Sequence, residues 1–267
     1  MNPPRPRKPN FLVIGAQKAG TTYLCAGLTR HPDVYFSDPK ELMFFNQPQP
    51  IGQEDFNAYL ERHFAGAAER RWVGEGSTTY FQWPRALPRI REYLGDELRI
   101  ILCLRHPVEK ALSFYLHNWR KGRLKGDESI LEFDRNDVEN SPLGTSFYAR
   151  HLQRWLGVYG RDRIHVMLFD LLRENRLRFL QSATKFLGVS PLRAASEEIV
   201  NPGPQLKMSG NHLVVRRSAK HESLLQPRFT MDDVARLQSL FSEDIERTEQ
   251  LLSMDLSAWK RLPDFGL

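Results

Sequence analysis

A short apolar run at residues 11–14 leads directly into the segment GAQKAGTT at residues 15–22. The glycines of this segment allow a tight turn that presents backbone N–H groups, and apolar residues then follow at helical spacing, at Tyr23, Leu24 and Leu28. The N-terminus of a helix that begins in this way favours a bound anion. The pattern therefore predicts a strand, a phosphate-binding loop and a helix in immediate succession.

Polar side chains of the same segment add to its backbone donors. Lys18 supplies a mobile positive charge, and Thr21 and Thr22 supply hydroxyl groups at the first turn of the expected helix. Together with the N–H groups of Ala19 and Gly20, these groups can hold one phosphate. A P-loop kinase or NTPase has its lysine directly after the last glycine, whereas here the lysine precedes that glycine, so the order argues against a kinase.

Further along the chain, β-rich or apolar runs alternate with helical patterns. Strands are expected at residues 34–36, 72–74, 98–104 and 164–169, and helices at residues 84–94, 107–120, 147–159, 177–187 and 234–252. Such alternation predicts a single α/β domain over residues 11–267, with a central, mostly parallel sheet flanked by helices. Residues 1–10 are basic and rich in proline, and we expect them to form a loose tail.

A second strand end also carries residues suited to phosphate. The apolar run at residues 98–104 stops at Arg105, and Pro107 can occupy the first turn of the next helix. Ser113 lies two turns along that helix, on much the same face as Pro107. An arginine fork can bind a phosphate through two hydrogen bonds, and ligands of parallel sheets bind at the carboxyl ends of the strands. Arg105 and Ser113 are therefore candidates for a second anion site.

Charge and composition narrow the class of ligand. The 267 residues include 38 Lys and Arg against 32 Asp and Glu, a net charge of +6, which favours phosphorylated small molecules or polyanions. The 2 cysteines are too few for a disulfide framework, and no segment approaches the length of an apolar membrane span. We therefore expect a cytoplasmic protein without a membrane span, and without a nucleic-acid partner, because no RNA- or DNA-binding motif is present.

The order K-x-G-T-T after a strand resembles the 5′-phosphosulfate-binding loop of sulfotransferases that use 3′-phosphoadenosine 5′-phosphosulfate (PAPS). The segment RIILCLRHPVEKALSFYLHN at residues 99–118 resembles their 3′-phosphate segment, in which Arg105 and Ser113 match the positions that grip the 3′-phosphate. The resemblance implies a P-loop-NTPase-like sulfotransferase fold, PAPS as the donor, 3′-phosphoadenosine 5′-phosphate (PAP) as the product, and no metal. It also places Lys207, in residues 201–211, where the family closes a basic loop over the nucleotide, although the K-G-R pattern of the heparan-type enzymes is absent.

In motif style the chain is most similar to the heparan sulfate and related carbohydrate sulfotransferases and to bacterial sulfotransferases. The segment SDPKELMFF at residues 37–45 resembles the one that carries their catalytic glutamate. The match implies that Glu41 is the base that accepts the proton of the acceptor hydroxyl, while Lys18 stabilises charge on the departing nucleotide. Lys40, next to Glu41, is expected to orient the sulfonate.

The segment EGSTTYF at residues 75–81 resembles the EKSPxYF loop of the same family, with Thr78 in place of the proline. Tyr80 in this segment is a candidate for contact with the acceptor. The acceptor itself is open, because a saccharide, a lipid and a secondary metabolite each fit. The basic cluster, which we define as Arg120, Lys121, Arg123 and Lys125, can recruit an anionic acceptor if it borders the site.

Two other classes of protein remain as alternatives. A P-loop-type nucleotide kinase would need an acidic strand end that binds a metal, together with magnesium-dependent binding of ATP. A non-catalytic polyanion-binding protein would explain the positive charge, but it would not explain two phosphate sites at two strand ends. The sequence therefore favours a sulfotransferase that moves a sulfuryl group from PAPS to an acceptor hydroxyl.

Overall fold

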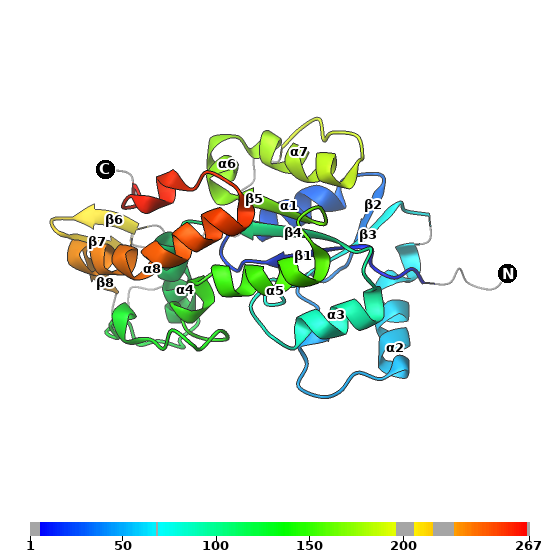
Figure 1. Ribbon diagram of the computed structural model, residues 1–267, viewed down its shortest axis with the longest axis horizontal. Coiled ribbons are helices and arrows are strands. Elements are labelled where there is room, and N and C mark those ends of the chain that lie inside the picture. The colour runs from blue at the N-terminus through cyan, green and yellow to red at the C-terminus, as the bar shows by residue number, and fades with distance from the viewer. Residues whose placement is uncertain (1–5, 68, 196–205, 216–226, 266–267) are drawn as a thin grey trace. The chain divides into compact units, whose positions relative to one another are not determined.

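The computed structural model of the chain describes residues 6–67, 69–195, 206–215 and 227–265, and Figure 1 shows its helices and strands. The chain forms two compact units. The first, here called the sheet unit, comprises Met1–Arg105 and Arg154–Val200, and the second, the helical unit, comprises His106–Gln153 and Asn201–Leu267. The expectation of a single domain over residues 11–267 stays a prediction, because the contacts within each unit do not decide it.

A five-stranded sheet forms the centre of the sheet unit, and all of its neighbouring strands are parallel. The order is β2-β3-β1-β4-β5, with β1 at Phe11–Gly15, β2 at Val34–Phe36, β3 at Trp72–Gly76, β4 at Arg99–Leu104 and β5 at Ile164–Leu168. Continuous apolar runs form such strands because both faces of a parallel sheet are covered. Every residue of β1 is buried, as is every residue of β4 except Arg99. The predicted α/β class with a parallel sheet is confirmed.

Helices cover this sheet. They are α1 (Thr21–Thr29), α2 (Gln53–Phe64), α3 (Ala86–Leu94), α6 (Phe169–Glu174) and α7 (Arg176–Leu187), with short 3-10 turns η1 (Phe44–Asn46) and η2 (Ala65–Ala67). In Figure 1, α6 and α7 lie on the opposite side of the sheet from α3. Helix α1 packs so closely on α7 that a Cβ added to Gly27 would lie 2.4 Å from Leu180 Cδ2. Helix α7 ends before Gly188, which adopts the left-handed conformation common at helix C-termini.

The helical unit is built around α4 (Pro107–Arg120) and α8 (Met231–Leu252), which contact each other. Its other elements are η3 (Ile130–Glu132), η4 (Gly144–Ser146), η6 (Ser257–Lys260) and an antiparallel sheet of β6 (Leu206–Ser209), β7 (His212–Val215) and β8 (Arg228–Thr230). Helix α5 (Ala149–Tyr159) contains the boundary between the units. Its first turn is capped by Asp244 of α8, whose carboxylate accepts from the N–H groups of Tyr148 and Ala149 at 2.7 and 3.0 Å.

The described part of the expected tail, residues 6–10, lies against the sheet unit. The backbone N–H of Asn10 donates to the carbonyl of Val73 at 2.9 Å, and the backbone N–H of Val73 donates to the side-chain Oδ1 of Asn10 at 2.8 Å. The Lys8 ammonium donates to the carbonyl of Tyr93 at 3.1 Å. Residues 1–5 lie outside the described residues. Among the described helices, none is long and apolar enough to cross a membrane.

Candidate functional site

The five parallel strands end at one edge of the sheet, because parallel strands run in the same direction. Each strand end leads into a segment with polar, charged or aromatic side chains. The segment after β2 carries Lys40 and Glu41, and the one after β3 carries Thr78. The segment after β1 is the predicted phosphate-binding loop, with Lys18. Arg105 directly follows β4 and Phe169 directly follows β5. This edge of the sheet unit is therefore the candidate site.

The phosphate-binding loop depends on its two glycines. Gly20 has φ 86° and Gly15 has φ 153°, which L side chains rarely adopt. Space is equally restrictive, because a Cβ on Gly20 would lie 2.6 Å from Leu172 Cδ2 and one on Gly15 would lie 2.8 Å from Phe81 Cβ. Lys18 also has a positive φ, of 65°. The loop is thus folded into a shape that few other sequences permit, as the pattern predicted.

Helix α1 begins at this loop with Gly20 as its N-cap. Because glycine has no side chain, the cap makes no side-chain hydrogen bond to the first turn, and no acidic residue lies in that turn. An anion is therefore the natural partner for the first N–H groups of the helix. Thr21 is buried and Thr22 is half-buried at this turn, and Ala19 is buried within the loop.

Arg105 lies at the loop that carries Lys18. Its Nη1 approaches the carbonyl oxygen of Lys18 at 3.4 Å. Its guanidinium also lies 4.5 Å from the centre of the Phe169 ring, and the guanidinium of Arg173 lies 4.9 Å from the same ring. Phe169 was not among the predicted site residues, although it is the last residue of the strand expected at residues 164–169.

Ser113 and Lys207 belong to the helical unit. Ser113 is half-buried on α4, and Lys207 is exposed on β6. Most of the segment before Lys207, residues 201–205, lies outside the described residues. The joint action of Ser113 with Arg105, and of Lys207 on the nucleotide, therefore stays a prediction. All four residues of the basic cluster are exposed: Arg120, Lys121, Arg123 and Lys125.

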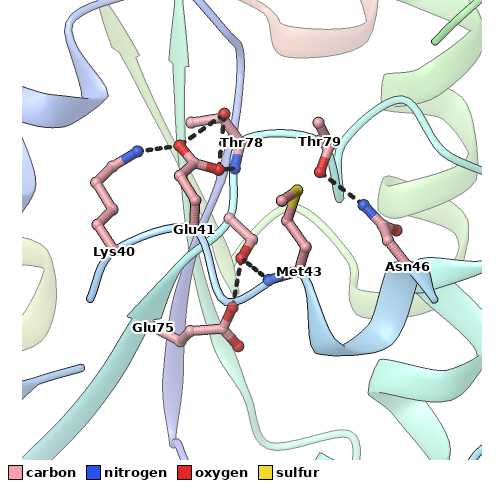
Figure 2. A network of polar contacts seen from close by, with 8 residues as sticks. Lys40, Glu41, Met43, Asn46, Glu75, Thr78 and Thr79 are labelled. Atoms are coloured by element: carbon pink, nitrogen blue, oxygen red, sulfur yellow. Dashed lines mark hydrogen bonds and ion pairs between the residues drawn. The ribbon is translucent and has the colours of Figure 1, made fainter. Parts of the chain in front are cut away.

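The Glu41 carboxylate is held by two neighbours (Figure 2). Lys40 forms an ion pair with Glu41 Oε1. Thr78 donates its backbone N–H to Oε2 at 2.8 Å and its hydroxyl to Oε1 at 2.9 Å. The Glu41 side chain is 34% exposed and that of Lys40 is 21% exposed, so both remain within reach of a ligand.

A second carboxylate, Glu75 of β3, supports the same segment from within the core. Glu75 is fully buried and accepts the hydroxyls of Ser77, Tyr59 and Tyr80 at 2.5, 2.7 and 2.8 Å. Burial raises the pKa of Glu75 above its ordinary value, and the three hydroxyl donors oppose this shift only in part. The Ser77 hydroxyl also accepts from the N–H of Met43 at 2.8 Å, which ties the core to the segment that carries Glu41 (Figure 2).

Tyr80 is part of this support. Its side chain is fully buried, and its hydroxyl donates to Glu75 and accepts from the N–H of Phe45 at 3.3 Å. Burial raises the pKa of Tyr80 well above its ordinary value. Through these contacts Tyr80 joins Glu75 of β3 to Phe45 in the segment after β2. Direct contact between Tyr80 and an acceptor stays a prediction.

Among the described residues, no group of three or more His, Cys, Asp and Glu side chains is arranged to hold a metal ion. The histidines nearest the candidate site in sequence, His106 and His117, belong to the helical unit. His106 is buried, with its Nε2 at 3.1 Å from the carbonyl oxygen of Arg261. Glu41 is a partly exposed carboxylate at this edge, and its role as the base stays a prediction.

Residues 81–248 match the family model described as the sulfotransferase domain. The human bifunctional heparan sulfate N-deacetylase/N-sulfotransferase 2 is 31% identical over 205 residues, which is 69% of this chain and 22% of that protein. The Drosophila melanogaster bifunctional heparan sulfate N-deacetylase/N-sulfotransferase is 28% identical over 211 residues, 69% of this chain and 20% of that protein. The chain thus spans about a fifth of the length of these relatives.

The crystal structure of a sulfotransferase from Alicyclobacillus acidocaldarius is also similar. It is 28% identical to this chain, with a TM-score of 0.74, and the match covers 96% of this chain and 100% of the other. The fold and the family match therefore point to the same class as the phosphate-binding loop and the strand-end residues do. The chain belongs to the sulfotransferase domain family.

Proposed function

We propose that this protein transfers a sulfuryl group from PAPS to an acceptor hydroxyl. The observation that carries the proposal is the meeting of Arg105 with the loop of Lys18 at one edge of the sheet. PAPS carries phosphate at both its 5′ and its 3′ side, so its binding site needs two sets of anion-binding groups. A helix N-terminus with a lysine and two threonines suits one side, and an arginine fork suits the other.

Each donor-binding residue has a defined part in this proposal. The N–H groups of Ala19 and Gly20, the hydroxyls of Thr21 and Thr22, and the Lys18 ammonium hold the 5′-phosphosulfate. Arg105 and Ser113 hold the 3′-phosphate, and Lys207 covers the bound nucleotide. PAP leaves as the product, and the transfer uses no metal.

In the transfer step, the acceptor oxygen forms a bond to sulfur while the bond from sulfur to the 5′-phosphate oxygen breaks. The electron pair of the breaking bond leaves with PAP, and Lys18 stabilises the charge that develops on the departing oxygen. Glu41 takes the proton of the acceptor hydroxyl, a role that typically contributes a factor of about 10² to 10⁴. Lys40, paired with Glu41, orients the sulfonate. Positioning of the reactants and stabilisation of the developing charge account for most of the lowering of the barrier.

The acceptor is a saccharide, a lipid or a secondary metabolite with a free hydroxyl. The names of these relatives refer to heparan sulfate, an anionic saccharide, and the exposed basic cluster of the helical unit would favour an acceptor of that charge if it borders the site.

Isothermal titration calorimetry of the whole chain with PAP and with ATP tests the donor, and labelled PAPS with a panel of hydroxyl acceptors then tests the transfer. We expect PAP to bind without added metal and more tightly than ATP. Magnesium-dependent binding of ATP without binding of PAP would instead favour a nucleotide kinase. Affinity for polyanions that survives Lys18→Ala, in a protein that does not bind PAP, would favour a polyanion-binding protein.

A further inference from the structure

Thr78 contacts the Glu41 carboxylate through both of its donors. The backbone N–H lies 2.8 Å from Oε2, and the hydroxyl lies 2.9 Å from Oε1 and 3.1 Å from Oε2. Thr78 itself is 5% exposed, so its own position is fixed by the packing around it. Two donors on one rigid residue define the plane and direction of the carboxylate, which a single flexible lysine does not.

The backbone of the same segment is also held in an unusual conformation. Glu41 and Met43 have φ values of 67° and 51°, in the left-handed region that residues other than glycine seldom occupy. Such a conformation persists only where neighbouring contacts enforce it. The N–H of Glu41 donates to the carbonyl of Gly76 at 2.9 Å, and that of Met43 donates to the Ser77 hydroxyl at 2.8 Å. The segment that carries Glu41 is therefore held by three consecutive residues, which are Gly76 at the end of β3 and Ser77 and Thr78 after it.

We propose that Thr78 is a positioning residue of the transfer, which holds the Glu41 carboxylate in the orientation that accepts the proton of the acceptor hydroxyl. This inference rests on the proposed role of Glu41 as the base. A proline at position 78, as in the EKSPxYF pattern that this segment resembles, would supply neither the N–H nor the hydroxyl. The threonine therefore gives this chain a means of orienting its base that the pattern alone does not contain.

Thr79 provides a matched control on the adjacent position. It is 7% exposed, close to the value for Thr78, and its hydroxyl accepts from Asn46 Nδ2 at 2.6 Å (Figure 2). Replacement of either threonine by valine keeps the shape of the side chain and removes one hydrogen-bonded hydroxyl. The two variants should therefore lose similar stability, but only Thr78→Val removes a hydrogen bond to the Glu41 carboxylate.

The test compares Thr78→Val, Thr78→Ser and Thr79→Val in the whole chain. The readouts are kcat and the donor KM with labelled PAPS and 4-nitrophenyl β-glucoside as probe acceptor, whose sugar hydroxyls are protonated at neutral pH, the affinity for PAP, and the thermal midpoint. We expect Thr78→Val to lower kcat by about 10- to 100-fold, the range that misplacement of a catalytic group produces, with the donor KM and PAP affinity unchanged. Thr78→Ser keeps both donors, and Thr79→Val does not touch Glu41. The kcat of each of these two variants should therefore stay within about twofold of the wild-type value.

Equal kcat values for Thr78→Val and Thr79→Val would overturn the positioning role. Failure of the base role has a different signature, which is turnover by Glu41→Gln at close to the wild-type rate. Failure of the proposed function itself is the absence of PAP binding and of transfer from labelled PAPS in the wild type. If Glu41→Gln is inactive while Thr78→Val equals Thr79→Val, the base stands and the positioning role falls. If Thr78→Val also loses affinity for PAP in proportion to kcat, its effect is a general disturbance of the site and the inference is wrong.

Discussion

Among single residues, Glu41 combines a left-handed backbone, partial exposure and a carboxylate held by Lys40 and Thr78. A surface carboxylate without a function rarely carries this combination, because backbone strain persists only where the surroundings enforce it. The sequence could indicate Glu41 only through the resemblance of residues 37–45 to a known segment. Its contacts with Thr78 depend on the pairing of β2 with β3, which brings two segments separated in the chain to one edge.

Glu41→Gln is the most direct test of the base. Glutamine keeps the size of the side chain but cannot accept the proton, so we expect turnover of labelled PAPS to fall by about 10²-fold or more. The affinity for PAP, measured by calorimetry, should be nearly unchanged, because Glu41 is assigned to the acceptor side. Glu54→Gln, which alters an exposed carboxylate of α2, is the control and should keep wild-type activity. A Glu41→Gln variant with most of its kcat would remove Glu41 from the mechanism.

Arg105→Ala tests the second anion site. Loss of a charged hydrogen-bonding group that contacts the nucleotide typically costs about 1.5–3 kcal/mol, which corresponds to a weakening of about 10- to 100-fold in PAP affinity. Arg91→Ala is the control, since Arg91 is exposed and pairs with Asp96 at 2.7 Å on α3 and the loop after it. Equal affinity of the Arg105→Ala variant and the wild type for PAP would contradict the assignment.

At the scale of helices and strands, the apolar strands and the helix after the phosphate-binding loop were predictable, since they depend on local periodicity. Helix α2 was missed although the signal was present, because Phe56, Tyr59, Leu60 and Phe64 stand at the spacing of an amphipathic helix. The antiparallel sheet of β6, β7 and β8 was also missed, because its strands are three or four residues long and are recognisable only through their pairing. Short elements of this kind are specified by tertiary contacts more than by local sequence.

The loop between β1 and α1 allows a comparison between two glycines of similar backbone conformation. Gly20 and Gly160 have φ values of 86° and 71°, but no atom lies within 4 Å of a Cβ on Gly160, whereas Leu172 crowds one on Gly20. Gly160→Ala should therefore cost about 1 kcal/mol of stability from the backbone alone. Gly20→Ala should cost about 1–3 kcal/mol of stability more than Gly160→Ala does, because the added methyl group overpacks the site. It should also weaken PAP binding. Urea unfolding and calorimetry measure both effects, and equal losses in the two variants would contradict the crowding.

For the whole molecule, the decisive feature is that the segments after all five parallel strands meet at one edge of the sheet unit. The order β2-β3-β1-β4-β5 places the phosphate-binding loop between the segments that carry Thr78 and Arg105. A net charge of +6 adds a general attraction for an anionic donor, which added salt should weaken. Stability is also a property of the whole molecule, and a buried carboxyl in the sheet unit makes it depend on pH.

Burial raises the pKa of Glu75 above its ordinary value of 4.5. The folded protein therefore binds a proton more strongly at this site than the unfolded chain does, and the contribution of Glu75 to stability falls as the pH rises from about 4.5 through the folded pKa. Glu75→Gln removes this titration. Relative to the wild type, the unfolding free energy of Glu75→Gln should thus improve as the pH rises above 4.5 through the folded pKa, as urea unfolding can measure. A constant difference across this range, like that expected for Glu54→Gln, would contradict the effect of burial.

The sequence alone determined the strand, loop and helix of residues 11–29, the parallel α/β class and the candidate donor-binding residues. These features depend on the local periodicity of apolar residues, on the conformational freedom of glycine and on the order of lysine and glycine. Only the tertiary structure decided that Arg105 reaches the Lys18 loop, that Tyr80 is buried against Glu75, and that Thr78 grips Glu41. The physical reason is that these contacts join segments from different strands, so they exist only after the strands have paired in one order and register.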